Sequence, residues 1–494
     1  MGNFIPGTKK EQQAMLQDIG FRDWEDLFRD IPEDTRFRGE LDMPPGRSDL
    51  EVEREIRRMA GKNRIFPVML RGAGAYDHYV PAAVDEVSSR EEFLTAYTPY
   101  QAEISQGILQ SIFEYQTMIC ELTGMDVSNA SLYDGASAAA EACGMACDRK
   151  KKVLLLSETL DPRVVRVIRT YAAGRGQRIV MVPAVNGAAD PAALEKLLGE
   201  EPETAGFLMQ YPNYFGIVED ADKLAEITRR AGAKFLMHVN PLALGVLKTP
   251  GEIGADIVSG EGQPLGLGLA YGGPYLGILA CRKKLMRSMV GRLVGETKDS
   301  RGDRGYVLTL QAREQHIRRE KASSNVCSNQ ALCALKASVY LAAVGPAGLR
   351  QAAVLCSSKA HYLAERLAGA GLTPAYDRPF FHEFVTVSRD PATKNILHAL
   401  ADNGILGGFP LSDHEILWCA TEKNTKEDMD RAAAIVAETL SGLSGRRDGA
   451  APGETMKEAA EKTSDKAVKE AAKEMSDKAM KEAAEKIPGK EVQA

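Results

Sequence analysis

The sequence predicts an α/β fold, a large domain with a mostly parallel sheet followed by a smaller α+β domain. Short apolar runs alternate with segments of helical periodicity from about residue 125 to about residue 300. Longer helices and two β-like runs then follow between about 330 and 440. With 494 residues, 44% of them hydrophobic, the chain can bury a large core. We therefore expect a large α/β domain over residues 61–329 and a small α+β domain over residues 330–440.

Apolar runs are expected to form the strands of the parallel sheet, with amphipathic helices packed around them. Each run is short and continuous, which is typical of strands that are buried on both faces of a sheet. The expected strands are Val153–Leu156, Arg178–Pro183, Ala205–Gln210, Lys234–Val239 and Ile257–Ser259. The expected helices are Ile104–Leu122, Pro162–Tyr171, Pro191–Leu198 and Asp222–Ala231. Ligands of such sheets bind at the carboxyl ends of the strands, so functional residues are expected there.

Two flanking segments differ in composition from the expected domains. Residues 1–60 are rich in charge and have the pattern of short helices. Residues 445–494 repeat a Lys/Glu/Ala motif every twelve residues, and Met456, Val468 and Met480 keep this period. On a helix, a step of twelve residues rotates by about 120°, so these side chains form no common stripe. We expect this segment to be a solvated tail, flexible or partly helical.

Composition excludes several classes of function. A net charge of −6 provides no basic face for nucleic acid. The chain has no uninterrupted apolar run near the ~18 residues of a membrane span, and its beginning lacks a secretory apolar core. The eight cysteines are scattered, and the sequence has no His-x-x-x-His or Cys-x-x-Cys pair. We therefore expect a cytoplasmic protein with no metal site and no disulfide framework.

A turn leading into a helix at Tyr133–Glu141 has the composition of a phosphate-binding cradle. Gly135 permits a tight turn, and the amides of Gly135, Ala136 and Ser137 would point outward at a helix N-terminus. In a sheet of this kind, this is where a pyridoxal phosphate enzyme of the aspartate aminotransferase-like fold, fold type I, holds its phosphate. An ordinary Gly–Ser helix cap is the alternative interpretation.

Two further groups that pyridoxal phosphate chemistry needs are missing. The cofactor needs a lysine for the internal aldimine and an acid beside its pyridine nitrogen. The acid should follow the strand Lys234–Val239, but Asn240 stands there. The lysine should follow the next strand, but no lysine lies between Lys248 and Lys283. We therefore expect no catalytic residue in this chain and no covalently bound cofactor. The cradle would then be vestigial.

Long motifs, in order along residues 1–440, resemble glycine dehydrogenase (decarboxylating). More narrowly, they are similar to the family of first subunits of its two-subunit form, which corresponds to the amino-terminal half of the P-protein of the glycine cleavage system. The segments that carry the resemblance are Gly72–Tyr79, Tyr97–Gly107, Phe113–Thr117, Asn129–Ala142, Gln210–Gly216, Tyr271–Pro274 and Ser323–Gln330. The tail from about residue 445 falls outside this pattern.

The resemblance implies both a fold and a role. The fold is that of pyridoxal-phosphate-dependent transferases, fold type I, with a large and a small domain. In this family the Schiff-base lysine and the cofactor belong to subunit 2, the expected partner in an α₂β₂ assembly. The assembled enzyme removes carbon dioxide from glycine and passes the aminomethyl group to the lipoyl arm of H-protein. This chain is then expected to be inactive alone.

Polar and aromatic residues on two loops are candidates for a wall of the partner's pocket. They are Tyr76, His78, Tyr97, Tyr100 and Gln101. Each could instead serve packing. An alternative function is an autonomous pyridoxal phosphate enzyme, an aminotransferase or lyase. It would have to use Lys234, Lys283 or Lys321, none of which follows a strand at the required position. A scaffold with no part in catalysis is the third hypothesis.

Overall fold

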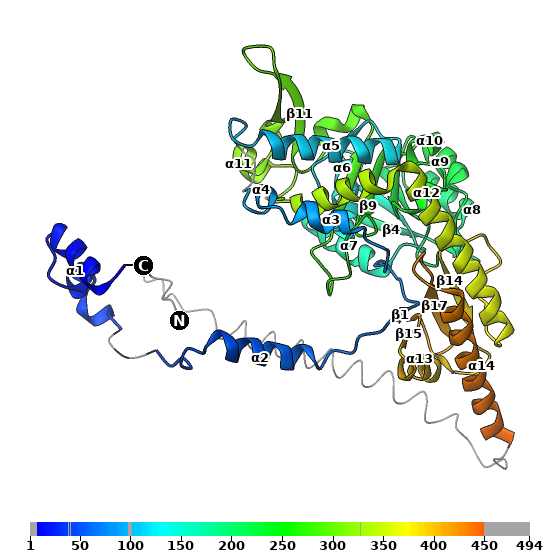
Figure 1. Cartoon of the computed structure of the whole chain (residues 1–494). Coiled ribbons are helices and arrows are strands. Elements are labelled where there is room, and N and C mark those ends of the chain that lie inside the picture. Colours follow the sequence, from blue (N-terminus) through cyan, green and yellow to red (C-terminus); the bar gives the residue numbers. More distant parts are fainter. Residues whose placement is uncertain (1–6, 38, 40, 97–100, 327, 449–494) are drawn as a thin grey trace, which may run out of the picture. The chain divides into compact units, whose positions relative to one another are not determined.

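The computed structural model describes residues 7–37, 39, 41–96, 101–326 and 328–448. The chain divides into two units, Met1–Phe66 and Pro67–Ala494. In the first unit, the α-helices are α1 (Lys9–Asp18) and α2 (Asp49–Ala60) (Figure 1). Each begins with a capping box, Thr8 with Glu11 and Ser48 with Glu51, which satisfies amides of the first turn. Two 3₁₀ turns, Trp24–Phe28 and Glu33–Thr35, lie between them.

Within the described part of the second unit, seven strands form one sheet in the order β2-β10-β9-β8-β7-β3-β4. These strands are β2 (Val127–Ser128), β3 (Val153–Ser157), β4 (Arg178–Val182), β7 (Thr204–Tyr211), β8 (Lys234–Val239), β9 (Ile257–Glu261) and β10 (Gly277–Cys281). The strands from β9 to β4 are parallel, whereas β10 is antiparallel to both its neighbours. The five expected strands are thus confirmed as members of one sheet, and β2 and β10 were not predicted.

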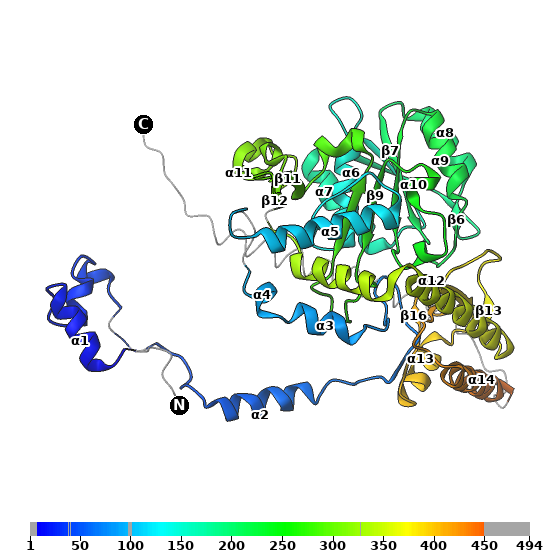
Figure 2. The same ribbon diagram turned by 45° about the horizontal axis from the view of Figure 1, so that its top comes forward.

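Both faces of this sheet are buried, as its continuous apolar strands require. Along β3, Val153 and Leu155 pack into one core, and Leu154 and Leu156 pack into another on the opposite face. The helices of the large sheet are α5 (Gln106–Thr123), α6 (Gly135–Ala146), α7 (Pro162–Arg175), α8 (Pro191–Glu200), α9 (Ala221–Arg230) and α10 (Pro250–Ile253). Residues of α6 and α7 cover one face, and residues of α5, α8 and α9 cover the other (Figure 2). The four expected helices are therefore present.

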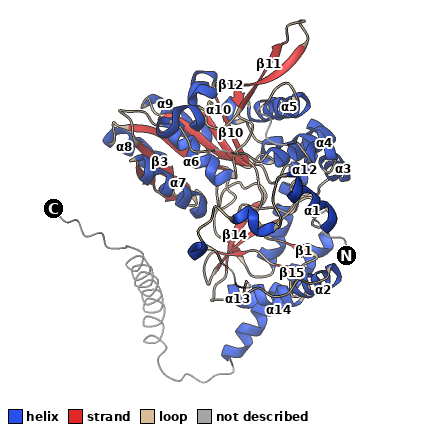
Figure 3. Ribbon diagram, turned by 90° about the vertical axis from the view of Figure 1, so that its left-hand side faces the viewer, coloured by secondary structure: helices blue, strands red, loops and turns tan. Residues whose placement is uncertain are grey.

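A second sheet lies in the carboxyl-terminal part of the described chain (Figure 3). Its strands, in spatial order, are β13 (Thr373–Pro374), β14 (Glu383–Val387), β17 (Glu415–Cys419) and β16 (Phe409–Pro410). Helices α13 (Thr393–Asp402) and α14 (Lys426–Asp448) pack with this sheet around the buried Trp418. A short strand β1 (Val68–Met69) pairs with β15 (Ile405–Leu406), so the chain just before the first glycine-rich loop joins this core. The predicted tail lies outside the described residues, except 445–448 at the end of α14.

The long helix α12 (Ala331–Gly369) connects the two cores. It is kinked at Gly345, which has a φ of 60° and precedes Pro346. Before the kink, Ala337 and Tyr340 pack in the core of the large sheet. After it, Leu363 and Leu367 pack in the core of the small one. Among the described residues, α12 is the one helix long and apolar enough to span a membrane. Its contacts with both cores account for this composition.

The remaining elements are short connections. They are α3 (Ala82–Ser88), α4 (Glu91–Leu94), β5 (Ala184–Val185), β6 (Ala188–Ala189), the hairpin of β11 (Leu293–Lys298) and β12 (Arg304–Thr309), α11 (Gln315–Arg318) and several 3₁₀ turns. Gly72–Val80, the first glycine-rich loop, follows β1 and has no regular secondary structure. This loop reaches both sheets, because Tyr76 is hydrogen-bonded to Gln263 after β9 and to Glu383 in β14.

Candidate functional site

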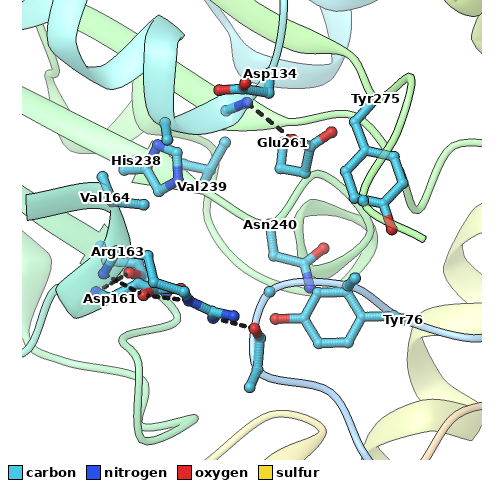
Figure 4. Close-up of a pocket in the computed structure, with 17 residues that line it drawn as sticks. Tyr76, Asp134, Asp161, Arg163, Val164, His238, Val239, Asn240, Glu261 and Tyr275 are labelled. Carbon is cyan, nitrogen blue, oxygen red and sulfur yellow. Dashed lines mark hydrogen bonds and ion pairs between the residues drawn. The ribbon is translucent and has the colours of Figure 1, made fainter. Parts of the chain in front are cut away.

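A cavity of about 390 Å³ lies where the strands β7, β8 and β9 end and the helices α6 and α7 begin. This is the edge at which parallel sheets bind their ligands. Figure 4 labels the side chains that define it: Tyr76, Asp134, Asp161, Arg163, Val164, His238, Val239, Asn240, Glu261 and Tyr275. The lining residues include three carboxylates and one guanidinium, but no lysine.

Amides of the predicted phosphate cradle already donate hydrogen bonds to carboxylates of this chain. Asp134 is the N-cap of α6, and its Oδ1 accepts a hydrogen bond from the amide of Ser137 at 2.7 Å. The Oε2 atom of Glu261, the last residue of β9, accepts from the amide of Gly135 at 2.8 Å (Figure 4). The Oε1 atom of Glu261 accepts from the amides of Gln263 and Leu276, both at 3.0 Å. Two of the three predicted cradle residues, Gly135 and Ala136, line the cavity.

The pKa of Glu261 reflects this environment. Burial raises it to about 7, although hydrogen bonds from the amides of Gly135, Leu276 and Gln263 oppose the rise. The same close contact explains the glycine at 135. A Cβ atom there would lie 2.8 Å from the Cβ and 2.9 Å from the Cα of Glu261. The end of β9 therefore approaches the first turn of α6 as closely as a glycine allows.

The end of β8 provides no negative charge for a pyridinium nitrogen. Asn240 follows this strand, and its Oδ1 accepts from the amide of Leu242 at 3.0 Å. His238, two residues earlier, is buried, and its Nδ1 lies 3.1 Å from the hydroxyl oxygen of Ser259. Burial lowers the pKa of His238 to about 4, so its imidazole is neutral near pH 7. Neither residue can hold a protonated pyridine ring as a carboxylate would.

The guanidinium of Arg163 is the one cationic group among the lining residues, and a carboxylate of the same wall pairs with it. Arg163 Nε donates to Oδ1 of Asp161 at 2.9 Å, and Asp161 also caps α7 through the amide of Arg163. Arg163 donates in addition to the carbonyl of Ala73 in the first glycine-rich loop. This arginine is therefore committed to contacts within the chain (Figure 4).

The lysines that an autonomous enzyme would need lie elsewhere. Lys234 begins β8, at the opposite end from Asn240, and its Nζ donates to the carbonyl of Ala146 at 2.7 Å. Lys283 follows the antiparallel strand β10, whose last residue pairs with the first residue of β9. Lys321 is exposed in a 3₁₀ turn. None of the three lines the cavity.

Tyr76, one of the predicted pocket-wall residues, lines the cavity and is hydrogen-bonded on two sides. Its hydroxyl donates to Oε2 of Glu383 in β14 at 2.8 Å, and its amide donates to Oε1 of Gln263 at 2.9 Å. Gln263 Nε2 donates in return to the carbonyl of Tyr76 at 2.8 Å. Glu383 also accepts from the amide of Ala73 at 2.6 Å. This network fixes the loop against both sheets.

The other predicted wall residues are separated from the cavity or lie outside the described residues. His78 is buried and does not line the cavity, and its Nδ1 lies 2.8 Å from Oε2 of Glu422. Gln101 is exposed. Tyr97 and Tyr100 lie outside the described residues. The structure thus brings Tyr76 and His78 together in one loop but does not place them on a common wall with Gln101.

His78, Cys356 and Glu422 form a cluster that sequence reasoning missed. Their ligand-type atoms all lie within 4.8 Å of one another. Cys356 Sγ donates to Oε2 of Glu422 at 3.1 Å, and the amide of Tyr79 donates to Oε1 of Glu422 at 2.6 Å. Burial would raise the pKa of Glu422, but the contacts with His78, Tyr79 and Cys356 outweigh it and lower the pKa to about 2. These hydrogen bonds to Glu422 explain the cluster as a structural one, which holds His78 and Tyr79 of the first glycine-rich loop in place.

Glu261 and Glu383 were likewise absent from the predicted site. Glu261 could have been predicted from the sequence, because an acidic residue at the end of an apolar strand lies at the edge of the sheet where ligands bind. Glu383 carried no such signal, because its partners Ala73 and Tyr76 lie about three hundred residues away along the chain.

Comparison with protein families gives one description over most of the chain. A family model described as "Glycine cleavage system P-protein" matches residues 2–436. A relative from Desulfitobacterium hafniense is 50% identical over 447 residues, which cover 88% of this chain and 99% of the relative. A relative from Moorella thermoacetica is 48% identical over 442 residues, covering 88% and 98%. Both relatives are described as "Probable glycine dehydrogenase (decarboxylating) subunit 1".

Solved structures agree with the predicted fold. A crystal structure of glycine decarboxylase (P-protein), in inhibitor-bound form, matches with a TM-score of 0.83 and 40% identity over 89% of this chain and 100% of that one. Mouse CSAD in apo form matches with a TM-score of 0.61 and 16% identity, covering 85% of this chain and 92% of that one. An alanine–glyoxylate aminotransferase from Nostoc matches with a TM-score of 0.54 and 17% identity, covering 76% and 96%. The expected transferase fold of type I is confirmed.

Proposed function

The chain belongs to the glycine cleavage system P-protein family, and from that premise we propose that it is subunit 1 of a two-subunit glycine dehydrogenase (decarboxylating). With subunit 2 it removes carbon dioxide from glycine and transfers the aminomethyl group to the lipoyl arm of H-protein. The name shared by its relatives supports the enzyme and the existence of a second subunit. The α₂β₂ stoichiometry, H-protein as acceptor and a cytoplasmic location are parts of the same proposal.

In this proposal, the chain is a non-catalytic but required subunit, and the partner holds pyridoxal phosphate. One observation carries this division of labour: the cavity at the expected cofactor position has no lysine among its lining residues. The remaining residues also do not fit the cofactor. The carboxylate of Glu261 accepts the hydrogen bond of the Gly135 amide in the cradle, and Asn240 is found where the cofactor's pyridine nitrogen would need an acid. This cavity is therefore not the place where the reaction occurs in the proposed assembly.

The contribution of this chain is then to complete the pocket of its partner. Gln101, with Tyr97 and Tyr100 in the same segment of the sequence, stays our proposal for that wall. Gln101 is exposed and so is free to contact another subunit. Tyr76 and His78 are better assigned to holding the first glycine-rich loop, because their polar groups are bonded to Glu383 and Glu422 of the same chain.

The experiment is reconstitution from separately purified subunits. Glycine-dependent exchange of labelled bicarbonate into glycine is measured for this chain alone, for subunit 2 alone and for the mixture, each with H-protein and pyridoxal phosphate. We expect exchange by the mixture and none by this chain alone. Exchange or transamination by this chain alone would favour an autonomous enzyme. A mixture no more active than subunit 2 alone would favour a scaffold with no part in catalysis.

A further inference from the structure

We propose that the carboxylate of Glu261 permanently fills the anion-binding position at the N-terminus of α6, called the anion seat here, which the amides of Gly135, Gln263 and Leu276 form. Its side chain thereby excludes phosphate esters from the cavity of this chain. The inference deepens the proposed function. It rests on that function only in treating the cavity as the counterpart of a cofactor site. The missing lysine prevents covalent attachment of the cofactor. Glu261 acts on a separate property, which is whether a phosphate ester can bind in the cavity at all.

The contacts of Glu261 are those that a bound phosphate would make. A helix N-terminus binds anions through outward-pointing amides and the positive end of its dipole. Here the Glu261 carboxylate accepts from three amides, those of Gly135, Gln263 and Leu276, at 2.8 to 3.0 Å. They come from three places: the first residue of α6, the loop after β9 and the start of the return to β10. Such convergence is typical of a built anion site rather than of a chance helix cap.

The close approach of β9 to the first turn of α6 strengthens this interpretation. Any side chain at position 135 would collide with Glu261, so glycine at this position leaves just enough room for the strand end to reach the helix. Asp134 holds the amide of Ser137 in the same turn. The first turn of α6 is therefore supplied with two carboxylates, one from the turn itself and one from β9.

The charges around the cavity oppose a second anion. Asp134, Asp161 and Glu261 line it, and Arg163, the lining cation, is paired with Asp161. A phosphate dianion entering the seat would have to displace Glu261 from its amides, which costs hydrogen bonds. Above about pH 7, where Glu261 is ionised, the dianion would also lie beside the displaced carboxylate and be repelled by it. In the absence of the Glu261 side chain, the Gly135 amide would face the existing cavity and be available to an oxyanion.

The test compares the full chain with Glu261→Ala, using pyridoxine 5′-phosphate as the probe. This compound has the ring and phosphate of the cofactor but no aldehyde, so no lysine can bind it covalently. Unphosphorylated pyridoxine and inorganic phosphate are the companion probes. Glu195→Ala is the matched control, because Glu195 is an exposed glutamate in α8 that pairs with the exposed Arg230 and does not line the cavity. Binding is followed by isothermal titration calorimetry and by the shift in melting temperature.

We expect Glu261→Ala to bind pyridoxine 5′-phosphate at least ~10-fold more tightly than the unchanged chain, with a rise in melting temperature. Pyridoxine should bind no more tightly to the variant than to the unchanged chain, and Glu195→Ala should behave as the unchanged chain does. Glu261→Ser is the second variant, since its hydroxyl can still accept from one amide if the alanine variant does not fold.

Two results would overturn the proposal. One is saturable binding of pyridoxine 5′-phosphate or inorganic phosphate by the unchanged chain with the affinity of the variants. The other is no binding by variants whose circular dichroism is that of the folded chain. A failure of the proposed function would be seen in a different assay, as absence of glycine exchange by the unchanged chain mixed with subunit 2. The two failures are therefore distinguishable.

Discussion

The Nδ1 atom of His78 lies 2.8 Å from Oε2 of Glu422, although 344 residues separate the two along the chain. Together with the bond from Tyr76 to Glu383 in β14, this contact fastens the first glycine-rich loop to the small sheet and to the segment between β17 and α14. The loop also contacts Gln263 at the end of the large sheet. Residues 72–80 therefore act as a clasp between the two cores.

His78→Ala should destabilise the folded chain. The side chain of His78 is 2% exposed and that of Glu422 is 12% exposed, so the variant would leave a nearly buried carboxylate short of a partner. We expect the free energy of unfolding to fall by about 3 kcal/mol. The measurement is urea denaturation followed by circular dichroism.

His398→Ala is the matched control for this experiment. His398 and Asp402 lie 2.9 Å apart in α13, with side chains 73% and 58% exposed. Such a surface pair contributes at most ~0.5 kcal/mol to the free energy of unfolding, so this variant should unfold at the same urea concentration as the unchanged chain. Equal stabilities of His78→Ala and His398→Ala would mean that the loop is not held by His78.

The buried carboxyl of Glu383 should make stability depend on pH. Burial raises its pKa to about 7, although hydrogen bonds from Ala73 and Tyr76 lower it, while the same carboxyl in the unfolded chain has an ordinary pKa of ~4.3. Between these values the folded state keeps a proton that the unfolded state releases, so stability falls as pH rises through this window. The contribution is present below about pH 4 and lost as the pH rises through about 7, with a limit of ~4 kcal/mol.

Glu383→Gln should remove this part of the pH dependence. The amide cannot ionise, so the variant should lose less stability than the unchanged chain between pH 5 and pH 8. Glu261, whose pKa is also raised to about 7, is present in both proteins and cancels in the comparison. Parallel stability curves for the two proteins across this range would mean that Glu383 titrates normally in the folded chain.

Gly135→Ala should be costly, whereas Gly174→Ala should not. A Cβ at 135 would lie under 3.0 Å from the backbone of Glu261, so the strand end or the helix must move. We expect a loss of about 2 kcal/mol or more in unfolding free energy. Gly174 lies within α7 with no atom within 4 Å of an added Cβ, and alanine there should stabilise by ~0.5–1 kcal/mol. Differential scanning calorimetry of both variants tests the contrast.

Truncation after Arg446 should leave melting temperature and complex activity nearly unchanged. The Lys/Glu/Ala repeat has no apolar stripe with which to offset the entropy of ordering, ~1–2 kcal/mol per residue. Activity is measured with subunit 2 and H-protein, and melting with the isolated chain. A clear loss in either assay would mean that the repeat docks on one of these proteins or on this chain.

The elements of the large sheet were predictable because local signals agree there. The runs at Val153 and Lys234 are continuous and apolar, and Asp161–Pro162 both caps and begins α7. Strand β10 was missed because Gly277–Cys281 follows a glycine-rich loop without a helix before it, which breaks the alternation that identified the other strands.

The site was predictable only where chemistry follows directly from chain position. Asn240 at the end of β8 and the missing lysine after β9 could be read from the sequence. The contact of Glu261 with Gly135 spans 126 residues, and the contact of Tyr76 with Glu383 spans 307. No local pattern specifies such pairs, because a buried carboxylate finds its donors only once the sheets and loops have assembled.

In the proposed assembly, subunit 2 holds the cofactor and this chain does not. The most direct measurement is borohydride reduction of the reconstituted complex with pyridoxal phosphate, followed by mass spectrometry of peptides from both subunits. We predict a pyridoxyl-lysine in subunit 2 and none in this chain. A stoichiometric pyridoxyl group on a lysine of this chain, such as Lys234, Lys283 or Lys321, would mean that this chain itself holds the cofactor.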